Sequence, residues 1–507
     1  MKKYTCPSLY KAAIAAWCAA LAACAVGPDY RKPDADRPAA FKENADWKPA
    51  KPGDELKRGA WWEIFGDPAL DALEAQVDGA NQSLAQAEAQ YRQAAALVSA
   101  ARANFFPTVA VSASATRSAR YGNSSSIVSG GTVIGGATGT TASGVHIGNT
   151  YSLPFTASWE PDLWGRVRRT VEEQAANAQA SAATLESTRL SLHAELAQDY
   201  FQLRIVDEQK RLLDDTVAAY RKSLELTENQ YKVGVAARAD VVQADTQLKT
   251  AQAQAIDLGI SRAQLEHAIA LLIGKTPAEF SLPAQRLTIA PPAIPVGVAS
   301  ELLERRPDVA AAERQVAAAN AQIGVAESAF FPTLTLSAEA GFQSSSFSKW
   351  LTAPSRFWSL GPQLAETIFD GGARRSQTAA ARAAYDAAVA NYRETALAAF
   401  QNVEDELAAL RILDAEAAAQ AEAVRAAEES LRIANNQYRA GTVSYLNVVT
   451  AEATAYSNER NAINILSNRL TDSVALVKAL GGGWNDSDLP KPGDIDRKST
   501  PPGPVSP

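Results

Sequence analysis

The sequence is poor in the residues that build redox, metal and nucleophilic sites. It has three cysteines and three histidines in 507 residues. His146, His193 and His267 lie far apart, and no group of His, Cys and carboxylate residues has metal-ligand spacing. A Gly-x-Ser-x-Gly nucleophile elbow is also absent. The sequence therefore offers no constellation for catalysis, and we expect no enzyme and no bound cofactor or metal.

A phosphate-binding loop is missing as well. The segment LLIGKTP at 271–277 is similar to the end of such a loop, but Ile269 stands where the first glycine of G-x-x-x-x-G-K-[ST] should be. The related segment KALGGGW at 478–484 has the glycines of a helix C-cap. We therefore expect no nucleotide site.

Positive charge and long apolar runs are scarce. The formal net charge is -7. This value includes the lysines of an N-terminal leader, Lys2, Lys3 and Lys11, so the chain without the leader is more acidic. A basic patch of the kind that binds nucleic acid is absent, so DNA and RNA are excluded as partners. No apolar run reaches the ~20 residues of a transmembrane helix. Any membrane crossing must therefore use strands.

The N-terminus has the pattern of an export signal. An apolar, Ala-rich stretch at 12–23 follows the basic start. It ends in LAAC, which resembles a bacterial lipoprotein signal and implies a signal peptide 1–23 and a covalent lipid on Cys24. Ala25, rather than an acidic residue, comes next and favours the outer membrane. The mature chain keeps one cysteine, which excludes an intramolecular disulfide. The alternative for Cys24 is a small buried thiol.

An internal repeat organises the rest of the chain. A shift of 207 residues superposes the motif NQYKVG at 229–234 on NQYRAG at 436–441, and Gly274 on Gly481. The motif FFPT occurs at 105–108 and 330–333, an offset of 225. The first copy therefore has 18 extra residues, which we place in a Gly/Ser/Thr-rich loop at 121–144.

Each copy has one stretch of 68 residues without Gly or Pro, at 166–233 and 373–440. As a helix, each would be about 100 Å long. Apolar residues recur at spacings of 4 and 3, which predicts a coiled-coil seam. The seam residues are Leu213, Val217, Tyr220, Leu224 and Tyr231 in the first copy, and Val424, Ala427, Leu431, Ala434 and Tyr438 in the second. Shorter helical stretches follow the turn glycines and end at Gly274 and Gly481 as C-caps. We predict two helical hairpins whose turns contain Tyr231, Gly234, Tyr438 and Gly441.

Between each FFPT motif and each long helix, the hydrophobic period changes from 3.6 to 2. Four segments of about 9 to 11 residues alternate between apolar and polar side chains, as membrane-barrel strands do around a wet lumen. The alternative is a half-buried sheet in a soluble sandwich. The predicted outward side chains are Val109, Val111, Ala113 and Ala115, then Tyr151, Leu153, Phe155, Ala157 and Trp159, then Leu334, Leu336 and Ala338, then Trp358, Leu360 and Leu364.

Four strands with open edges are not stable in lipid, because backbone groups at the edges would lack partners. The chain must therefore oligomerise. Two chains would give eight strands and a bore that side chains nearly fill, whereas three would give twelve strands and a bore wide enough for water and solutes. We therefore favour three chains for a conduit.

These motifs together resemble the outer membrane factor family, in particular its lipoprotein branch, the NodT family. The matching segments cover nearly all of the chain up to about residue 484. They are CAVGPDYRKP from Cys24, RGAWWEIFGDPALDAL at 58–73, both FFPT turns, DLWGR with its partner FDGGARR, and both NQY..G turns. The turns between strands and helices would contain Pro107, Pro332, Gly165 and Gly372.

The resemblance implies an α+β membrane protein of the outer membrane, with a large periplasmic part. Three chains would share a 12-stranded β-barrel, four strands each, and a coiled-coil periplasmic tunnel would continue it. The chain would be a passive conduit for small toxic compounds in a tripartite efflux system. Its partners would be outer-membrane lipid, a periplasmic adaptor (membrane fusion) protein and an inner-membrane pump.

The resemblance also implies that the tunnel closes just past the second hairpin turn, at Leu446, Asn447 and Thr450. Relatives often carry aspartates at the last two positions. Because this sequence does not, we expect Tyr445 and Leu446 to form an apolar plug. Asp240 is the nearest acid of the first turn, and its alternative role is a solvated helix charge.

The predicted domain boundaries follow the repeat. We expect a signal peptide, a lipidated segment, repeat 1, a Pro-rich linker, repeat 2 and a disordered tail, at 1–23, 24–66, 67–275, 276–300, 301–483 and 484–507. Two other functions remain open. One is a type I protein secretion channel, and the other is a periplasmic adaptor lipoprotein.

Overall fold

The computed structural model describes residues 25–34, 41–44, 60–123, 143–287, 289–292, 294 and 302–495. The predicted leader, Cys24 and most of the predicted loop at 121–144 lie outside the described residues. The chain divides into two units. The sheet unit comprises the described residues of 1–30, 98–173 and 319–383, and the helical unit comprises those of 31–97, 174–318 and 384–507.

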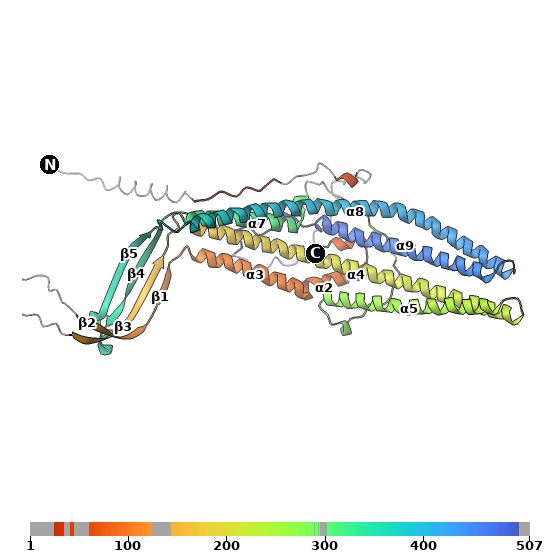
Figure 1. The fold of residues 1–507 in the computed structure, drawn as a ribbon, viewed down its shortest axis with the longest axis horizontal. Helices are drawn as coiled ribbons and strands as arrows, with labels where there is room; N and C mark the ends of the chain where they lie inside the picture. Colours follow the sequence, from red (N-terminus) through yellow and green to blue (C-terminus); the bar gives the residue numbers. More distant parts are fainter. Residues whose placement is uncertain are drawn as a thin grey trace, which may run out of the picture. The chain divides into compact units, whose positions relative to one another are not determined.

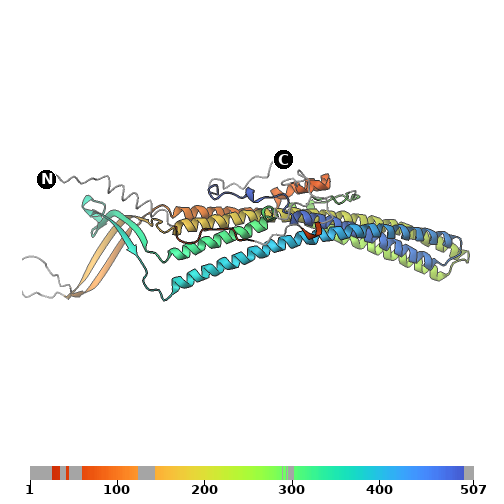
Figure 2. The same ribbon diagram turned by 90° about the horizontal axis from the view of Figure 1, so that it is seen from above.

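The two long helices are α4 (Arg166–Lys232) and α8 (Ala373–Arg439), with 67 residues each. The helices α5 (Arg238–Leu272) and α9 (Tyr445–Ala479) have 35 residues each and run back beside them (Figures 1 and 2). The offset between α4 and α8, and between α5 and α9, is 207 residues. The predicted helical hairpins are therefore confirmed.

Two further helices precede the strands, α3 (Gln82–Ala103) and α7 (Pro307–Ser328). None of the described helices combines the length and the apolar composition that a membrane span needs. The short helical elements are α2 (Pro68–Ala80), α6 (Leu302–Arg305), η1 (Lys42–Asn44), η2 (Trp61–Phe65), η3 (Pro277–Glu279), η5 (Phe347–Lys349), η6 (Ala353–Ser355) and η7 (Asp486–Asp488).

Local sequence explains where these helices begin and end. The side chain of Asp67 accepts a hydrogen bond of 2.8 Å from the backbone N–H of Ala69, and Pro68 occupies the first position of α2. Gly274 and Gly481 both have positive φ, +69° and +90°, and end α5 and α9. The two predicted C-cap glycines are therefore confirmed.

The core of the helical unit lies between the long helices and their shorter partners. Tyr220 of α4 packs against Leu248 and Ala251 of α5, which places it on the predicted seam. The side chain of Tyr231 differs, because 43% of it is exposed. Tyr231 is therefore not a seam residue in the described chain, although its counterpart Tyr438 is buried.

The sheet unit contains one antiparallel sheet in the order β1-β3-β4-β5, with β2 also paired to β3. Its strands are β1 (Thr108–Val111), β2 (Ser114–Asn123), β3 (Ser143–Trp159), β4 (Thr333–Ser344) and β5 (Arg356–Ala365). The sequence predicted one strand where β1 and β2 lie. The break falls opposite Pro154, whose missing N–H removes one ladder bond, although its carbonyl still accepts from Ser112 N at 3.2 Å.

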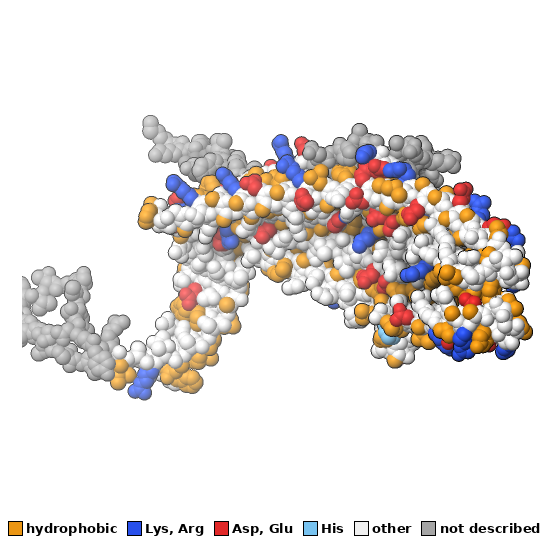
Figure 3. Space-filling view, turned by 45° about the vertical axis from the view of Figure 1, so that its right-hand side comes forward, with side chains coloured by type: hydrophobic (Ala, Val, Ile, Leu, Met, Phe, Trp, Pro, Cys, Tyr) orange, Lys and Arg blue, Asp and Glu red, His pale blue; other side chains and the backbone are white. Residues whose placement is uncertain are grey.

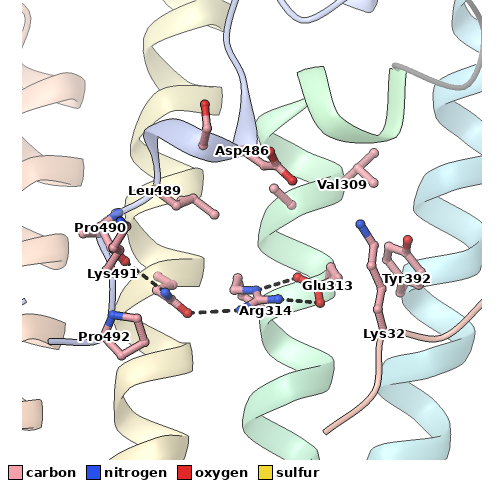
Figure 4. A pocket seen from close by; sticks show the side chains of 13 residues that line it. Lys32, Val309, Glu313, Arg314, Tyr392, Asp486, Leu489, Pro490, Lys491 and Pro492 are labelled. Atoms are coloured by element: carbon pink, nitrogen blue, oxygen red, sulfur yellow. Dashed lines mark hydrogen bonds and ion pairs between the residues drawn. The ribbon is translucent and has the colours of Figure 1, made fainter.

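The predicted disordered tail differs from the structure over its first residues. Residues 484–495 are described, and Trp484 and Leu489 pack against buried alanines of α4 and α7. The side chain of Gln179 donates to the carbonyl of Pro490 at 2.9 Å. This segment also lines a cavity of about 370 Å³ (Figure 4). Composition predicted disorder, but long-range contacts order this part of the chain.

Candidate functional sites: the sheet faces and the hairpin turns

Residues of one kind face the same side across the whole sheet. Val109, Ala157, Ala338 and Leu360 form one row of directly opposed residues. Opposed residues of antiparallel strands share a face, so this row joins predicted outward residues of all four segments. A second row of the same face comprises Val111, Phe155, Ala340 and Trp358. The predicted apolar face is therefore confirmed.

Solvent reaches this apolar face in the single chain. The exposed fractions are 73% for Val109, 74% for Leu360 and 79% for Trp358. Figure 3 shows hydrophobic side chains on the surface over the sheet. The rows that alternate with these carry small or polar side chains. They are Thr108, Ser158, Ser337 and Gly361, and Ala110, Thr156, Glu339 and Ser359. A thin sheet with one apolar and one polar face matches the requirement for a wall between lipid and water.

The predicted strand–helix turns lie at the helix-side end of the sheet. Pro107 and Pro332 each directly precede a strand, β1 and β4. Gly165 and Gly372 directly precede the long helices and have φ values of +84° and +94°, which favour glycine. The aromatic ring of Trp164 stacks on Phe331 with 4.9 Å between centroids. Aromatic side chains at a strand end are typical of a membrane interface.

The two hairpin turns have the same backbone hydrogen bonds. Gly234 N donates to Tyr231 O at 3.0 Å, and Val235 N donates to Gln230 O at 2.8 Å. In the second turn, Gly441 N donates to Tyr438 O at 2.9 Å, and Thr442 N donates to Gln437 O at 3.0 Å. Both are Schellman motifs, in which glycine takes the left-handed conformation.

The side chains of the two turns differ. The ring of Tyr438 lies 5.4 Å from that of Tyr445, between centroids. At the equivalent positions of the first turn, the guanidinium carbon of Arg238 lies 5.9 Å from the centroid of the Tyr231 ring. An aromatic pair therefore stabilises one turn, whereas an exposed cation–π contact stabilises the other.

The second turn holds the two hairpins together. The hydroxyl of Ser223 in α4 donates to the hydroxyl of Tyr445 at 3.2 Å. The hydroxyls of Thr227 in α4 and Tyr438 share a hydrogen bond of 3.1 Å. Tyr438 and Tyr445 also belong to a buried cluster with Ala244 of α5. This turn is therefore part of the core between the hairpins.

The structure separates the residues predicted to close a tunnel. Tyr445 is only 1% exposed, whereas Leu446 is 56% exposed. Asn447 and Thr450 are also exposed, and their helical spacing places them beside Leu446 on one strip of α9. The expected plug of Tyr445 with Leu446 therefore does not form on one surface of the chain. Tyr445 packs inward because it faces α4.

Asp240 has a local structural role. Its carboxylate accepts a hydrogen bond of 3.1 Å from the backbone N–H of Ala237, at the start of α5. An acid three residues after the N-cap residue stabilises the free N–H groups at the helix start. Asp240 does not contact Leu446, Asn447 or Thr450 through any hydrogen bond or ion pair in the described chain.

Sequence reasoning missed a buried acid near the turns. Glu452 of α9 is 8% exposed, and its Oε2 atom has no hydrogen-bond partner among the described residues. Burial raises the pKa of Glu452 to about 7. Burial raises the pKa of Tyr220 and of Tyr445 to about 12, and the nearby charge of Glu452 adds to both shifts. The signal available in the sequence was a glutamate at a position where the helical period places apolar residues.

Sequence reasoning also missed a buried ionic cluster around His193. Its Nδ1 lies 2.6 Å from Glu74 Oε2, and its Nε2 lies 3.5 Å from Asp78 Oδ1. The ring of Trp62 stacks on it at 4.5 Å. Burial alone would lower the pKa of His193, but the hydrogen bonds to Asp78 and Glu74 raise it to about 9. The cluster joins α2 to α4 across more than a hundred residues of sequence, which no local motif reveals.

Comparison with known proteins shows that most of the chain is similar to outer-membrane efflux proteins. A family model described as outer membrane efflux protein matches residues 74–275 and 298–482. The chain is 31% identical over 466 residues to the probable efflux pump outer membrane protein TtgC of Pseudomonas putida strain KT2440, covering 92% of this chain and 93% of that protein. It is 30% identical over 480 residues to outer membrane protein OprJ of Pseudomonas aeruginosa, covering 92% and 94%.

Solved structures give the same result. The outer-membrane channel OprN has a TM-score of 0.81 and 31% identity, covering 91% of this chain and all of that chain. CusC, whose study concerns transmembrane channel formation, has a TM-score of 0.78 and 26% identity, covering 90% of this chain and all of that chain. The similarity therefore includes the sheet unit and the helical unit.

Proposed function

Because the chain belongs to the outer membrane efflux protein family, we propose that it is the outer-membrane channel-tunnel of an efflux pump. It would export small toxic compounds passively. Relatives are named for efflux of antibiotics, toluene and solvents. The observation that carries the proposal is the sheet with one exposed apolar face and one polar face. The family match argues against the alternative that the chain is a periplasmic adaptor lipoprotein.

The barrel follows from the open edges of the sheet. β5 forms one edge, and β1 and β2 form the other. In lipid these edges must pair. β1 and β2 occupy one strand position beside β3, so each copy supplies four positions and three copies would close a 12-stranded barrel with an aqueous bore. We therefore propose a homotrimer whose apolar rows contact outer-membrane lipid and whose polar rows line the bore.

The helical hairpins would continue the conduit into the periplasm as a coiled-coil tunnel. Their equal lengths and common offset of 207 residues support two structural repeats. The tunnel would dock to a periplasmic adaptor and an inner-membrane pump. A covalent lipid on Cys24 would add a second anchor in the outer membrane.

The residues that narrow the tunnel would be the exposed strip of Leu446, Asn447 and Thr450. Tyr445 would support this strip from inside the chain rather than block the passage, because it is buried between the hairpins. Opening would require the hairpins to slide against each other, which is a shear motion.

Planar-bilayer recording of the purified full-length protein tests this proposal. Leu446→Ala should raise single-channel conductance, because it removes bulk from the proposed constriction. Leu397→Ala is a control, since Leu397 is also exposed, at 52%, but lies on α8 far in sequence from the turns. Equal conductance of both variants would contradict the placement of the constriction.

Cell fractionation and drug susceptibility test the wider proposal. We expect an oligomer in the outer membrane and increased sensitivity to solvents and antibiotics on deletion. Recovery in the inner membrane would contradict an outer-membrane conduit. Unchanged sensitivity together with loss of an exported protein would instead favour type I secretion.

A further inference from the structure

Backbone hydrogen bonds hold the segment that directly follows Cys24 in place within the sheet unit. Val26 N donates to the carbonyl of Trp164 at 3.0 Å. The guanidinium of Arg169, near the start of α4, donates from Nε to Val26 O at 3.2 Å and from Nη2 to Gly27 O at 3.2 Å. One side chain therefore holds two successive carbonyls of this segment.

Two more contacts continue along the segment. Asn320 of α7 donates from Nδ2 to the carbonyl of Pro28 at 2.9 Å. Arg169 Nη2 also pairs with Asp29 at 3.0 Å, and its Nη1 pairs with Glu172 at 2.8 Å. The Arg169 side chain is only 6% exposed. Burying a guanidinium costs free energy unless its N–H donors have partners. The partners of Arg169 therefore fix the position of this segment.

Glycines make room for the segment. Gly27 has φ +97°, and a Cβ atom there would lie 2.5 Å from the Cα of Gly324 in α7. A Cβ on Gly324 would lie 2.9 Å from Arg169 Cγ and 3.0 Å from Val26 O. A Cβ on Gly165 would lie 3.0 Å from Ala25. Only glycine allows this approach, which forms a slot between α4 and α7 for residues 25–29.

The slot lies at the helix-side end of the sheet. Trp164, which accepts from Val26, also donates from its indole nitrogen to the carbonyl of Pro332 at 2.7 Å, directly before β4. Phe106, which lies two residues before β1, is 70% exposed. The N-terminal end of the segment therefore lies among aromatic residues close to the strand ends, where a membrane interface is expected.

We propose that this slot positions the N-terminal lipid. Consecutive Cα atoms are ~3.8 Å apart, so a lipid on Cys24 begins one residue from the contact between Ala25 and Gly165. The acyl chains then enter the membrane at a fixed depth relative to the apolar face of the sheet, rather than on a loose tether. Arg169 and Gly324 are positioning residues for this anchor. The inference rests on the proposed outer-membrane lipoprotein function.

Variants of the full-length protein in a Gram-negative host test the slot. Gly27→Ala and Arg169→Gln should release residues 25–34, so trypsin should cleave after Arg31 about tenfold faster, as expected for loss of one or two charge-assisted hydrogen bonds. The outer-membrane oligomer should decrease, while mass spectrometry still finds lipid on the N-terminal peptide. Gly79→Ala is the matched control, because a Cβ there meets no atom within 4 Å.

The possible outcomes distinguish a failure of the slot proposal from a failure of the proposed function. Unchanged cleavage in both variants would overturn the slot, and faster cleavage with an unchanged oligomer would overturn its role in positioning the lipid. A wild-type protein without lipid, or absent from the outer membrane, would overturn the proposed function itself. If Gly27→Ala is degraded in the cell, Arg169→Lys carries the test, because lysine keeps the charge but loses the planar fork.

Discussion

At the scale of single residues, the charge of Glu452 conflicts with its surroundings. The carboxyl is buried near Tyr220 of α4 and Tyr445 at the start of α9, and burial raises its pKa from 4.5 to about 7. The folded chain therefore holds this proton more tightly than the unfolded chain. Stability is greatest below about pH 4.5 for this group and is lost as the pH rises toward 7. Glu452 thus makes the packing of the hairpins sensitive to pH.

Glu452→Gln should stabilise the hairpin turns at pH 8 by about 2–3 kcal/mol and have little effect near pH 4.5, because the variant has no charge to bury. Amide hydrogen exchange of the backbone around Thr227 and Val448 in detergent measures the effect. Glu422→Gln is the control, since Glu422 has 78% of its side chain exposed. A variant with the same pH dependence as the wild type would contradict the assignment.

At the scale of elements, the two hairpin turns share a backbone and differ in side chains. Both require a glycine with positive φ, +82° at Gly234 and +72° at Gly441. The second turn adds the buried Tyr438–Tyr445 pair, whereas the first places Arg238 over an exposed ring. The first turn has fewer buried contacts, so we expect it to open more easily than the second.

Gly441→Ala tests the conformational requirement of the second turn. An L-residue in the left-handed region costs about 1–2 kcal/mol, so hydrogen exchange at the end of α8 should become about tenfold faster. Gly259→Ala, inside α5 with no atom near the added Cβ, should instead slow exchange slightly, because alanine favours helix. Equal effects of the two substitutions would contradict a special role for the turn glycine.

At the scale of the whole molecule, assembly follows from what one chain leaves open. A single chain exposes the apolar rows of its sheet and two unpaired strand edges. Lipid would cover the rows, and further copies would pair the edges. Both requirements are met together in a closed barrel, so insertion and oligomerisation should be coupled.

Leu360→Lys and Ser359→Lys, neighbours on β5, test which face meets lipid. Leu360 lies in an apolar row and Ser359 in a polar row. A lysine on the lipid face near the bilayer midplane costs about 2–4 kcal/mol per chain, whereas one in a wet bore costs little. We expect Leu360→Lys to reduce the outer-membrane oligomer strongly and Ser359→Lys to leave it. The reverse order would place lipid on the polar face.

The sequence alone determined those features that depend on local spacing. Long stretches without Gly or Pro predicted α4 and α8 to within one residue, and turn glycines marked their ends. Period-2 alternation predicted which side chains share a face, because the pleat of a strand fixes that relation wherever the strand lies. The same reasoning could not predict which of the adjacent residues Tyr445 and Leu446 is buried.

Tertiary structure decided the features that depend on contacts between distant segments. The hairpins bury Tyr445 but leave Leu446 outside, α2 meets His193, and residues 25–29 enter a slot between α4 and α7. Long-range packing also orders residues 484–495, whose composition favours disorder. Periodicity reports which face a residue occupies, but burial depends on which other segment covers that face, and only the folded chain brings those segments together.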